Sequence, residues 1–146
     1  MRKRKPDAHA ALGARRSACP INACLEVFGD PWSLLIVRDL LFFERRRYGE
    51  FLAAGEGMAT NILADRLRKL ARHGIVARRR DPDDARRLVY SLTEKGLDLA
   101  PLLVEMIIWA AGYEKTAAPP ALVRELRRDR EGYLSRLRAS LAARAR

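Results

Sequence analysis

The sequence has little of what catalysis and metal binding usually require. Two cysteines and two histidines stand among 146 residues, too few for a disulfide framework or a convincing metal site. Cys19 and Cys24 suit reduced thiols in a cytosol. No glycine-rich phosphate loop, carboxylate pair or nucleophile–base arrangement stands out. We therefore expect no enzymatic activity, no cofactor and no bound metal.

Long apolar runs are scarce as well. No stretch approaches the roughly 20 apolar residues that cross a bilayer, and the basic N-terminal stretch leads into no apolar signal region. The sequence thus predicts a cytoplasmic protein without a membrane partner. Because 49% of its residues are hydrophobic, a chain of this length can bury the core of one domain.

Positive charge is what the chain has in excess, with 29 Lys and Arg against 18 Asp and Glu. Residues 1–18 and 121–146 each contribute a net +5. Residues 59–90 hold a further +5, whereas the rest of the chain between the two ends is negative overall. Such a polarised distribution favours docking onto a polyanion more than it favours general solubility.

The stretch 60–74 predicts an amphipathic helix. Leu63, Leu67 and Leu70 recur at helical spacing and predict a buried stripe, and Gly74 supplies the left-handed residue that commonly ends a helix. The opposite side collects polar side chains, namely Asn61, Asp65, Arg68 and Arg72, flanked by Ala64 and Lys69. A short helix of this kind can lie in a DNA major groove. The plainer alternative is a solvated helix face.

The neighbouring patterns place this helix in a winged helix. A second helix is expected over 31–43, capped by Asp30 and apolar nearly all round, so that it lies at the centre of the domain. A short helix over 48–54 and a glycine-containing turn then precede 60–74, as in a helix-turn-helix. The strand-like runs 75–80 and 88–93, joined by a turn-rich tip, predict a basic hairpin.

The C-terminal third predicts two further helical segments. One begins at Thr93–Glu94 and runs toward Gly112, with a kink at Pro101 unless that proline falls in a first turn. Its stretch 99–111 is more apolar than a solvated helix should be, which favours packing against a second copy. After Pro119–Pro120 a basic, amphipathic final helix is expected, which either braces the dimer or flanks DNA.

The predicted fold class is therefore mainly α with a small β-hairpin, a winged helix-turn-helix with C-terminal dimerisation helices. Four regions follow from these patterns. They are a basic, flexible N-terminal arm over 1–18, a DNA-binding domain over 19–93, a dimerisation helix over 94–118 and a basic C-terminal helix over 119–146.

Several pieces occur together and in order: Cys19–Ile21, Gly29–Leu40, Arg47–Phe51, Met58–Leu63 with Arg66, Leu67 and Leu70, and Tyr90–Gly96. Over residues 19–112 they resemble the HxlR-type subgroup of bacterial winged-helix transcriptional regulators, relatives of the MarR group. The resemblance implies a homodimer that controls transcription by binding a specific operator in double-stranded DNA. In several members the cysteine before the Pro-Ile step senses electrophiles or oxidants, a role that would fall to Cys19.

The sequence departs from that family at two positions of interest. Ala59 stands where the family usually has a helix-capping serine, so the cap is expected to move to Thr60. Pro31 replaces the usual basic residue before the tryptophan, which removes one phosphate contact.

Residue chemistry divides the predicted DNA contacts by role. Asn61 and Arg68 are the expected base readers, since Asn can bond adenine and Arg guanine through two hydrogen bonds. Thr60 and Ala64 are expected to make smaller contacts. Asp65 either accepts from cytosine or holds a neighbouring arginine, and Arg66 is expected to pair with a carboxylate. The expected backbone contacts are Lys69 and Arg72, and Arg47 in the basic turn 45–47 completes the set.

The hairpin tip offers two further contacts. Arg86 and Arg87 can reach the minor groove or phosphates, with 78–80 in support. The alternative is that Asp81, Asp83 and Asp84 neutralise these arginines locally. DNA contact is the favoured hypothesis, because docking onto phosphates has to outweigh only weak surface pairs.

Cys19 is the candidate redox sensor. Arg15 and Arg16 precede it and a helix begins just after it, a setting that favours a reactive thiolate. An unreactive thiol packed at a dimer interface is the alternative. Cys24 is expected in the core.

Two functions follow from these features. The first is a homodimeric, sequence-specific transcriptional regulator that responds through Cys19 to an oxidant, an electrophile or a small ligand. The second is a basic architectural or RNA-associated protein whose charged ends carry the affinity.

Overall fold

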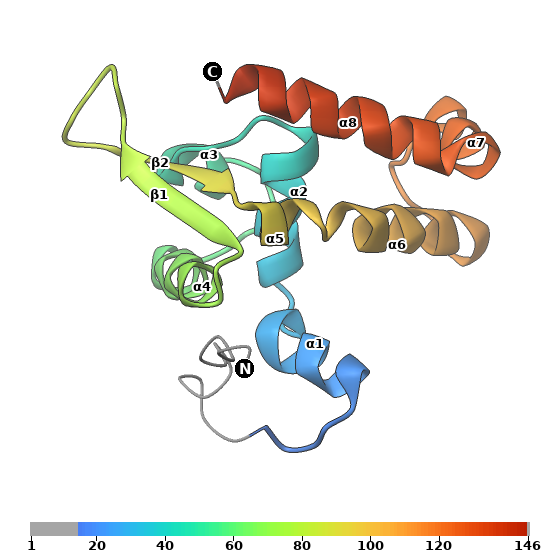
Figure 1. The fold of residues 1–146 in the computed structure, drawn as a ribbon, viewed down its shortest axis with the longest axis horizontal. Helices are drawn as coiled ribbons and strands as arrows, with labels where there is room; N and C mark the ends of the chain where they lie inside the picture. The colour runs from blue at the N-terminus through green and yellow to red at the C-terminus, as the bar shows by residue number, and fades with distance from the viewer. Residues whose placement is uncertain (1–14, 146) are drawn as a thin grey trace, which may run out of the picture. The chain divides into compact units, whose positions relative to one another are not determined.

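The described part of the N-terminal unit, residues 15–30, contains the helix α1. The structure is a computed structural model that describes residues 15–145 (Figure 1), and its contacts divide the chain into compact units at 1–30 and 31–146. Most of the arm predicted over 1–18 lies outside the described residues. In the first unit, α1 spans Pro20–Phe28 with Cys19 as its N-cap. Cys24 is exposed, so the expectation that it lies in the core was wrong.

The second unit contains the predicted winged helix, and its central helix is α2 (Ser33–Phe42). Ile36, Val37 and Leu41 of α2 are no more than 1% exposed, which confirms that this apolar helix lies at the centre. The helix begins at Ser33 with Trp32 as N-cap and no side-chain cap. The predicted start at Pro31 was therefore wrong by two residues.

A buried carboxylate on α2 holds the helix-turn-helix in place. Asp39 accepts from the guanidinium groups of Arg38 at 2.8 Å and Arg45 at 2.9 Å. Arg38 also reaches Glu56 at 2.6 Å, in the turn before the next helix. Burial alone would lower the pKa of Arg38, but the hydrogen bonds to Glu56 and Asp39 outweigh it and raise the pKa. Because buried charges need such partners, this network ties the turn to the central helix.

The helix-turn-helix consists of α3 (Tyr48–Leu52) and α4 (Thr60–Arg72). The Glu50 side chain caps α3 by accepting from the backbone N–H of Arg46 at 2.6 Å and Arg47 at 2.9 Å. The turn between the helices contains Gly55 and Gly57 at φ +86° and +70°, a conformation that side chains with a Cβ rarely adopt. The Tyr48 hydroxyl donates to the Thr60 carbonyl and so joins the starts of the two helices.

The hairpin follows α4 directly. β1 (Val76–Arg80) pairs antiparallel with β2 (Leu88–Leu92), with Val76 opposite Leu92 and Arg80 opposite Leu88. The segment before α3, expected to be only a basic turn, also pairs with β2 at one position, through an isolated antiparallel bridge between Arg47 and Val89. The Tyr90 N–H donates to the Arg46 carbonyl at 2.8 Å. These contacts anchor the hairpin to the helix-turn-helix.

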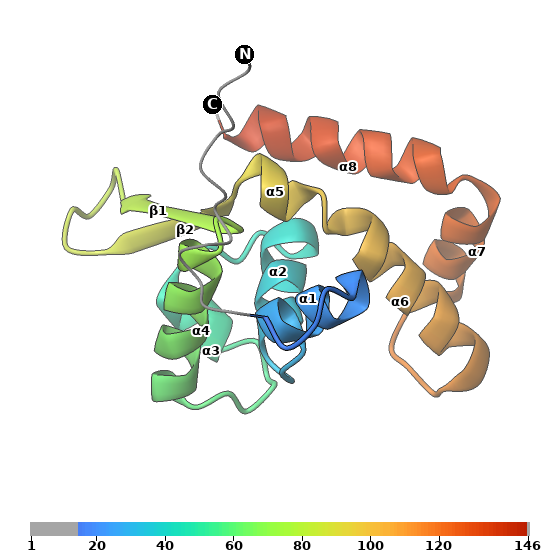
Figure 2. The same ribbon diagram turned by 60° about the horizontal axis from the view of Figure 1, so that its bottom comes forward.

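The C-terminal part contains more helices than predicted. The first predicted helix divides into α5 (Glu94–Leu97) and α6 (Ala100–Tyr113), with Pro101 in the first turn of α6. The second divides into α7 (Pro120–Arg128) and α8 (Arg130–Arg144), because Asp129 leaves helical geometry and its carboxylate accepts from the Gly132 N–H at 3.0 Å. Both views show α8 running back alongside α6 and α5 (Figures 1 and 2).

One segment departs from the expectation that no run reaches membrane length. By length and composition alone Glu94–Tyr113 could cross a membrane, and 22% of its most apolar window is buried in the protein. A single helix that passes this test is weak evidence of a membrane span. The segment is interrupted between α5 and α6 and carries Asp98 at that interruption. The apolar residues of this segment lie mainly on α6.

Candidate nucleic-acid interface

The predicted division of α4 into two faces is confirmed. Leu63, Leu67 and Leu70 are no more than 2% exposed, and they fasten the helix to the domain. The residues predicted on the outer side are exposed or half-buried: Thr60, Asn61, Asp65, Arg68 and Arg72 are exposed, while Ala64 and Lys69 are half-buried. The helix therefore presents a polar ridge, defined here as Asn61 through Arg72 on its outer side, which no part of the described winged-helix unit covers.

The start of α4 differs from the prediction. Ala59 itself is the N-cap, with φ −68° and ψ 150°, and makes no side-chain cap. Thr60 is the first helical residue, so the expected shift of the cap to Thr60 was wrong. The hydroxyl of Thr60 stands exposed at the end of the ridge.

Asp65 holds neighbouring arginines, one of the two roles left open for it. Its carboxylate lies 2.5 Å from Arg66 and 4.0 Å from Arg68. The side chain of Arg68 is 63% exposed, and an exposed pair at that distance stabilises a protein by only about 0–1 kcal/mol. Arg68 is therefore oriented by Asp65 but can leave it at little cost.

A hollow between α4 and the hairpin adds a second cationic surface. It measures about 240 Å³ and is lined by Leu67, Arg68, Ala71, Arg72, Arg78 and Tyr90. Burial raises the pKa of Tyr90, which keeps the phenol neutral. The hollow is lined by the guanidinium groups of three arginines together with the apolar side chains of Leu67 and Ala71. Such an arrangement can receive a phosphate group. Arg78, predicted only as support for the hairpin tip, thus faces the same hollow as Arg68.

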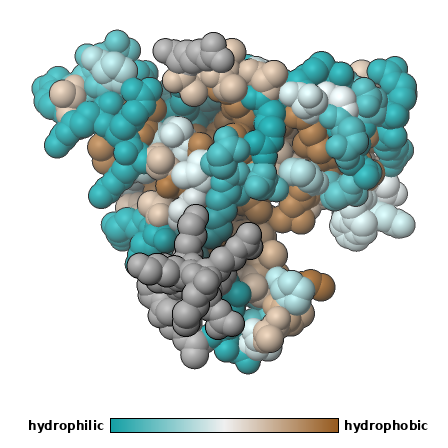
Figure 3. All heavy atoms as spheres, viewed as in Figure 1, coloured by the Kyte–Doolittle hydropathy of each residue, from teal (hydrophilic) through white to brown (hydrophobic). Residues whose placement is uncertain are grey.

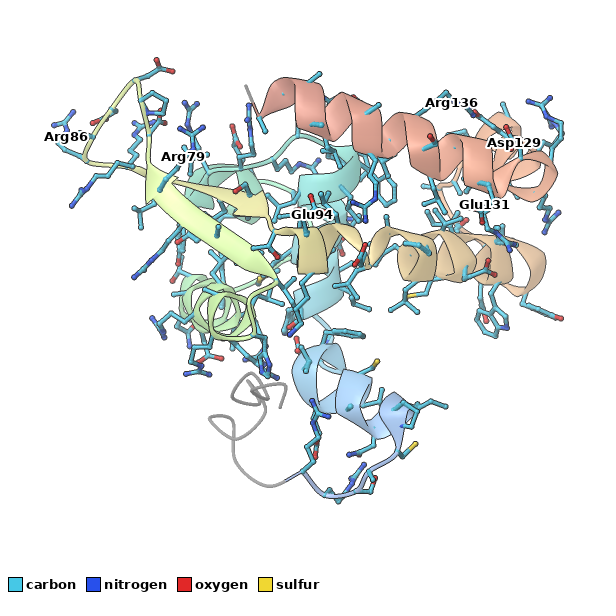
Figure 4. The ribbon with its side chains drawn as sticks, viewed as in Figure 1. Arg79, Arg86, Glu94, Asp129, Glu131 and Arg136 are labelled. Carbon is cyan, nitrogen blue, oxygen red and sulfur yellow. The ribbon has the colours of Figure 1, made fainter. Side chains whose placement is uncertain are left out.

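The tip of the hairpin carries the most exposed cations. The side chains of Arg86 and Arg87 are 91% and 67% exposed, and both pair with Asp84, at 3.1 and 3.4 Å. Figure 4 shows Arg86 projecting from the tip and Arg79 on β1, and Figure 3 shows hydrophilic side chains covering this end of the hairpin. The hydrogen bond from Arg86 lowers the pKa of Asp84. Local neutralisation is therefore present, and the direct ion pairs of Arg86 and Arg87 are both with Asp84.

The other two tip carboxylates pair with Arg47. Arg47 Nε donates to Asp81 at 2.6 Å, and its Nη2 lies 3.7 Å from Asp83. The Asp81 side chain is only 2% exposed, and the hydrogen bond from Arg47 lowers the pKa of Asp81 and raises that of Arg47. Arg47 thus fixes the loop at the tip of the hairpin to the start of α3. No local sequence pattern indicated this pair, because its members are 34 positions apart.

The surface between α3 and the hairpin continues the interface. A hollow of about 670 Å³ is lined by Arg47, Tyr48, Gly49, Glu50, Arg86, Arg87, Leu88 and Tyr90. Tyr90 lines this hollow and the smaller one beside α4. The ridge, the two hollows and the hairpin tip therefore form one cationic surface, which the structure builds from residues 47 to 90.

Cys19 belongs to the separate N-terminal unit. It is exposed, it is the N-cap of α1 as predicted, and its N–H donates to Ser17 Oγ at 3.3 Å. The Arg16 side chain donates to Asn22 rather than pointing at the thiol. Position at a helix start is therefore confirmed for Cys19, and a sensor role stays a prediction.

Known proteins share this architecture. Residues 27–118 match the HxlR-like helix-turn-helix family. The uncharacterized HTH-type transcriptional regulator sll1512 of Synechocystis is 40% identical over 88 residues, which are 60% of this chain and 64% of that protein. The chain therefore spans just under two thirds of the length of that relative.

Two solved structures share the fold as well. The crystal structure of PA1607, a candidate transcription factor, is similar with a TM-score of 0.64 at 40% identity, over 72% of each chain. The oxidized redox regulator HypR is similar with a TM-score of 0.59 at 27% identity, over 67% of this chain and all of that one. Because the family match covers more than half of the sequence, the chain belongs to the HxlR-like helix-turn-helix family.

Proposed function

We propose that the protein is a homodimeric transcriptional regulator that binds a specific, two-fold symmetric operator in double-stranded DNA. The observation that carries this proposal is the polar ridge of α4, rigidly backed by three buried leucines and flanked by the arginine-lined hollow. A ridge of this width suits the major groove, and the hairpin beside it suits the neighbouring backbone or minor groove. The relatives named as HTH-type transcriptional regulators support the same function.

The contacts divide into base reading and backbone binding. Asn61 and Arg68 read bases, with Thr60 and Ala64 making smaller contacts and Asp65 holding Arg68 in position. Phosphates are bound by Lys69, Arg72, Arg86 and Arg87. Since Arg47 is engaged with Asp81, its part is to position the hairpin on the duplex.

The dimer forms through α6. Leu102, Met106, Trp109 and Tyr113 are exposed large hydrophobic residues at helical spacing on that helix, and the rings of Trp109 and Tyr113 lie 5.3 Å apart. Aromatic residues and methionine are enriched in protein interfaces, and a symmetric dimer sets the same face of both copies together. A second copy of this chain is therefore the proposed occupant of the face, which also accounts for the apolar character of α6.

Cys19 is the proposed point of redox control. Its thiol is exposed at a helix start, where an oxidant or electrophile in solution can reach it. The similarity to the redox regulator HypR supports a sensor role. An oxidant or electrophile would act on Cys19 and change the affinity for the operator.

The proposal is tested in two steps. The purified protein selects fragments from genomic DNA, and fluorescence anisotropy then measures its affinity for the fragments recovered. In a charge-neutralised variant, Gln replaces four basic residues near the N-terminus and three exposed arginines of α7, namely Arg2, Lys3, Arg4, Lys5, Arg124, Arg127 and Arg128. If this variant still prefers the selected fragments over random duplex, the winged helix carries the specificity. Loss of all binding in the variant, or equal binding to random duplex and RNA in the native chain, supports the architectural alternative instead.

A further inference from the structure

The connection between α5 and α6 is a place where the dimer helix could pivot. Asp98 and Leu99 keep right-handed helical φ and ψ, but the Leu99 N–H donates to the Gly96 carbonyl three residues back instead of four, which interrupts the α-helical hydrogen-bond pattern between α5 and α6. The inner face of α6 packs through Ala100, Leu103 and Val104, all at its first half. Its exposed apolar residues extend to Tyr113 at the far end. A small rotation at Asp98 would therefore move the dimer face by a large distance.

Helix α8 crosses this connection and packs on both sides of it. Leu134, Leu137 and Leu141 of α8 share one small cavity of about 50 Å³ with α2, α5 and α6, where it is lined by Leu41, Leu97, Ala100 and Pro101. Figure 3 shows hydrophobic atoms in the strip between α8 and α6. One rigid helix thus contacts the central helix of the winged domain and the start of the dimer helix together.

Ion pairs fix α8 along its whole length. Arg130 near its start lies 2.7 Å from Glu105 on α6. Arg138 in its middle lies 2.9 Å from Glu94 on α5, and it also pairs with Asp98 at the connection itself. Arg144 near its end lies 2.6 Å from Glu44, between α2 and α3. A single exposed ion pair stabilises a protein only weakly. Several ion pairs on one rigid helix cost less conformational entropy per pair, because the helix has to be fixed in place only once.

We propose that α8 is a brace that sets the angle between the dimer helix and the DNA-binding surface, and that Arg138 and Arg144 thereby determine which operator half-site spacing the dimer accepts. This inference rests on the proposed function and answers the question that the sequence left open. The arginines of α8 at 130, 136, 138 and 144 are engaged with carboxylates of their own chain. Bracing, not DNA flanking, is the role of this helix.

The test compares operators whose half-sites differ in spacing. Two inserted base pairs displace one half-site by about 7 Å and turn it by about 70°, which a rigid dimer cannot follow. The double variant Arg138→Ala/Arg144→Ala is compared with the matched control Arg124→Ala/Arg128→Ala, which removes the same charge from exposed α7 positions that form no ion pair within the described residues. Circular dichroism and sedimentation velocity are used to check that each variant is folded and dimeric.

We expect the native chain and the control to lose about 10-fold or more in affinity on the lengthened operator, and the brace variant to lose less than about 3-fold. The charge reversal Arg138→Glu, which places a carboxylate beside Glu94 and Asp98, should broaden the spacing profile at least as much as the brace variant does. If the brace variant and the native chain have the same spacing profile, the bracing role of α8 is overturned. Binding of the native chain to a single half-site would in that case still support the proposed function. Absence of half-site binding by the native chain overturns both.

Discussion

Replacing Arg68 with alanine separates base reading from stability. Arg68 projects from α4 with 63% of its side chain exposed, and its nearest carboxylate is 4.0 Å away. Loss of that pair costs about 0–1 kcal/mol of unfolding free energy. A bidentate contact from Arg to guanine, in contrast, discriminates against a wrong base by about 1–3 kcal/mol. We therefore expect Arg68→Ala to leave stability nearly unchanged and to reduce discrimination at one base pair by about 5- to 150-fold.

The assay is fluorescence anisotropy at one fixed salt concentration, with an operator and its single-base-pair variants. The matched control is Arg87→Ala, which removes the same charge from the hairpin tip and should weaken binding to every variant alike. Urea unfolding of both mutants checks that stability is unchanged. If Arg68→Ala weakened all sequences equally, the assignment of base reading to this side chain would be wrong.

The remaining predictions concern the loop of the hairpin, the dimer face and the thiols. Because Arg47 lowers the pKa of Asp81 below its ordinary value of 3.8, their pair stabilises the fold above that value and the contribution is lost as pH falls through the lowered pKa. Asp81→Asn should thus flatten this part of the pH dependence of unfolding free energy, measured by urea unfolding between about pH 2 and 5; an unchanged slope would contradict it. Trp109→Asp should convert the dimer to a monomer in sedimentation velocity and weaken operator binding, whereas a dimer of unchanged stability would exclude α6 as the interface. Cys19→Ser should abolish the response of DNA binding to diamide without changing affinity under reducing conditions, and Cys24→Ser should respond like the native chain; a full response in Cys19→Ser would remove this thiol from the mechanism.

Local periodicity was enough to predict the parts of the interface that lie on single elements. The leucines at 63, 67 and 70 alone fixed which side of α4 is buried. Gly74 has φ +70°, as its place at the end of the helix predicted. The hairpin followed from two strand-like runs with a turn-rich tip between them, and its strands end within one residue of the expected bounds.

Contacts between distant positions are what the sequence could not reveal. The Arg47–Asp81 pair and the Arg47–Val89 bridge depend on tertiary packing, which no periodic pattern encodes. The division of the final segment at Asp129 was missed because its apolar residues keep helical spacing across the break. Asp129 is nevertheless a typical capping residue, and that local signal was available. Cys24 was misplaced because it follows Ile21 by three positions on the same helix and was expected to share a buried face with it, whereas Ile21 is 69% exposed and Cys24 is exposed as well.

Protection of guanine N7 from methylation on a selected operator tests the central claim most directly, because it reports major-groove contact base by base. Two copies of α4, held by one α6 interface, should lie in successive major grooves on one face of the duplex. We expect two symmetric patches of protection about 10 base pairs apart, each lost when Asn61 and Arg68 are replaced by alanine. A single patch, or protection that survives both replacements, would contradict the account.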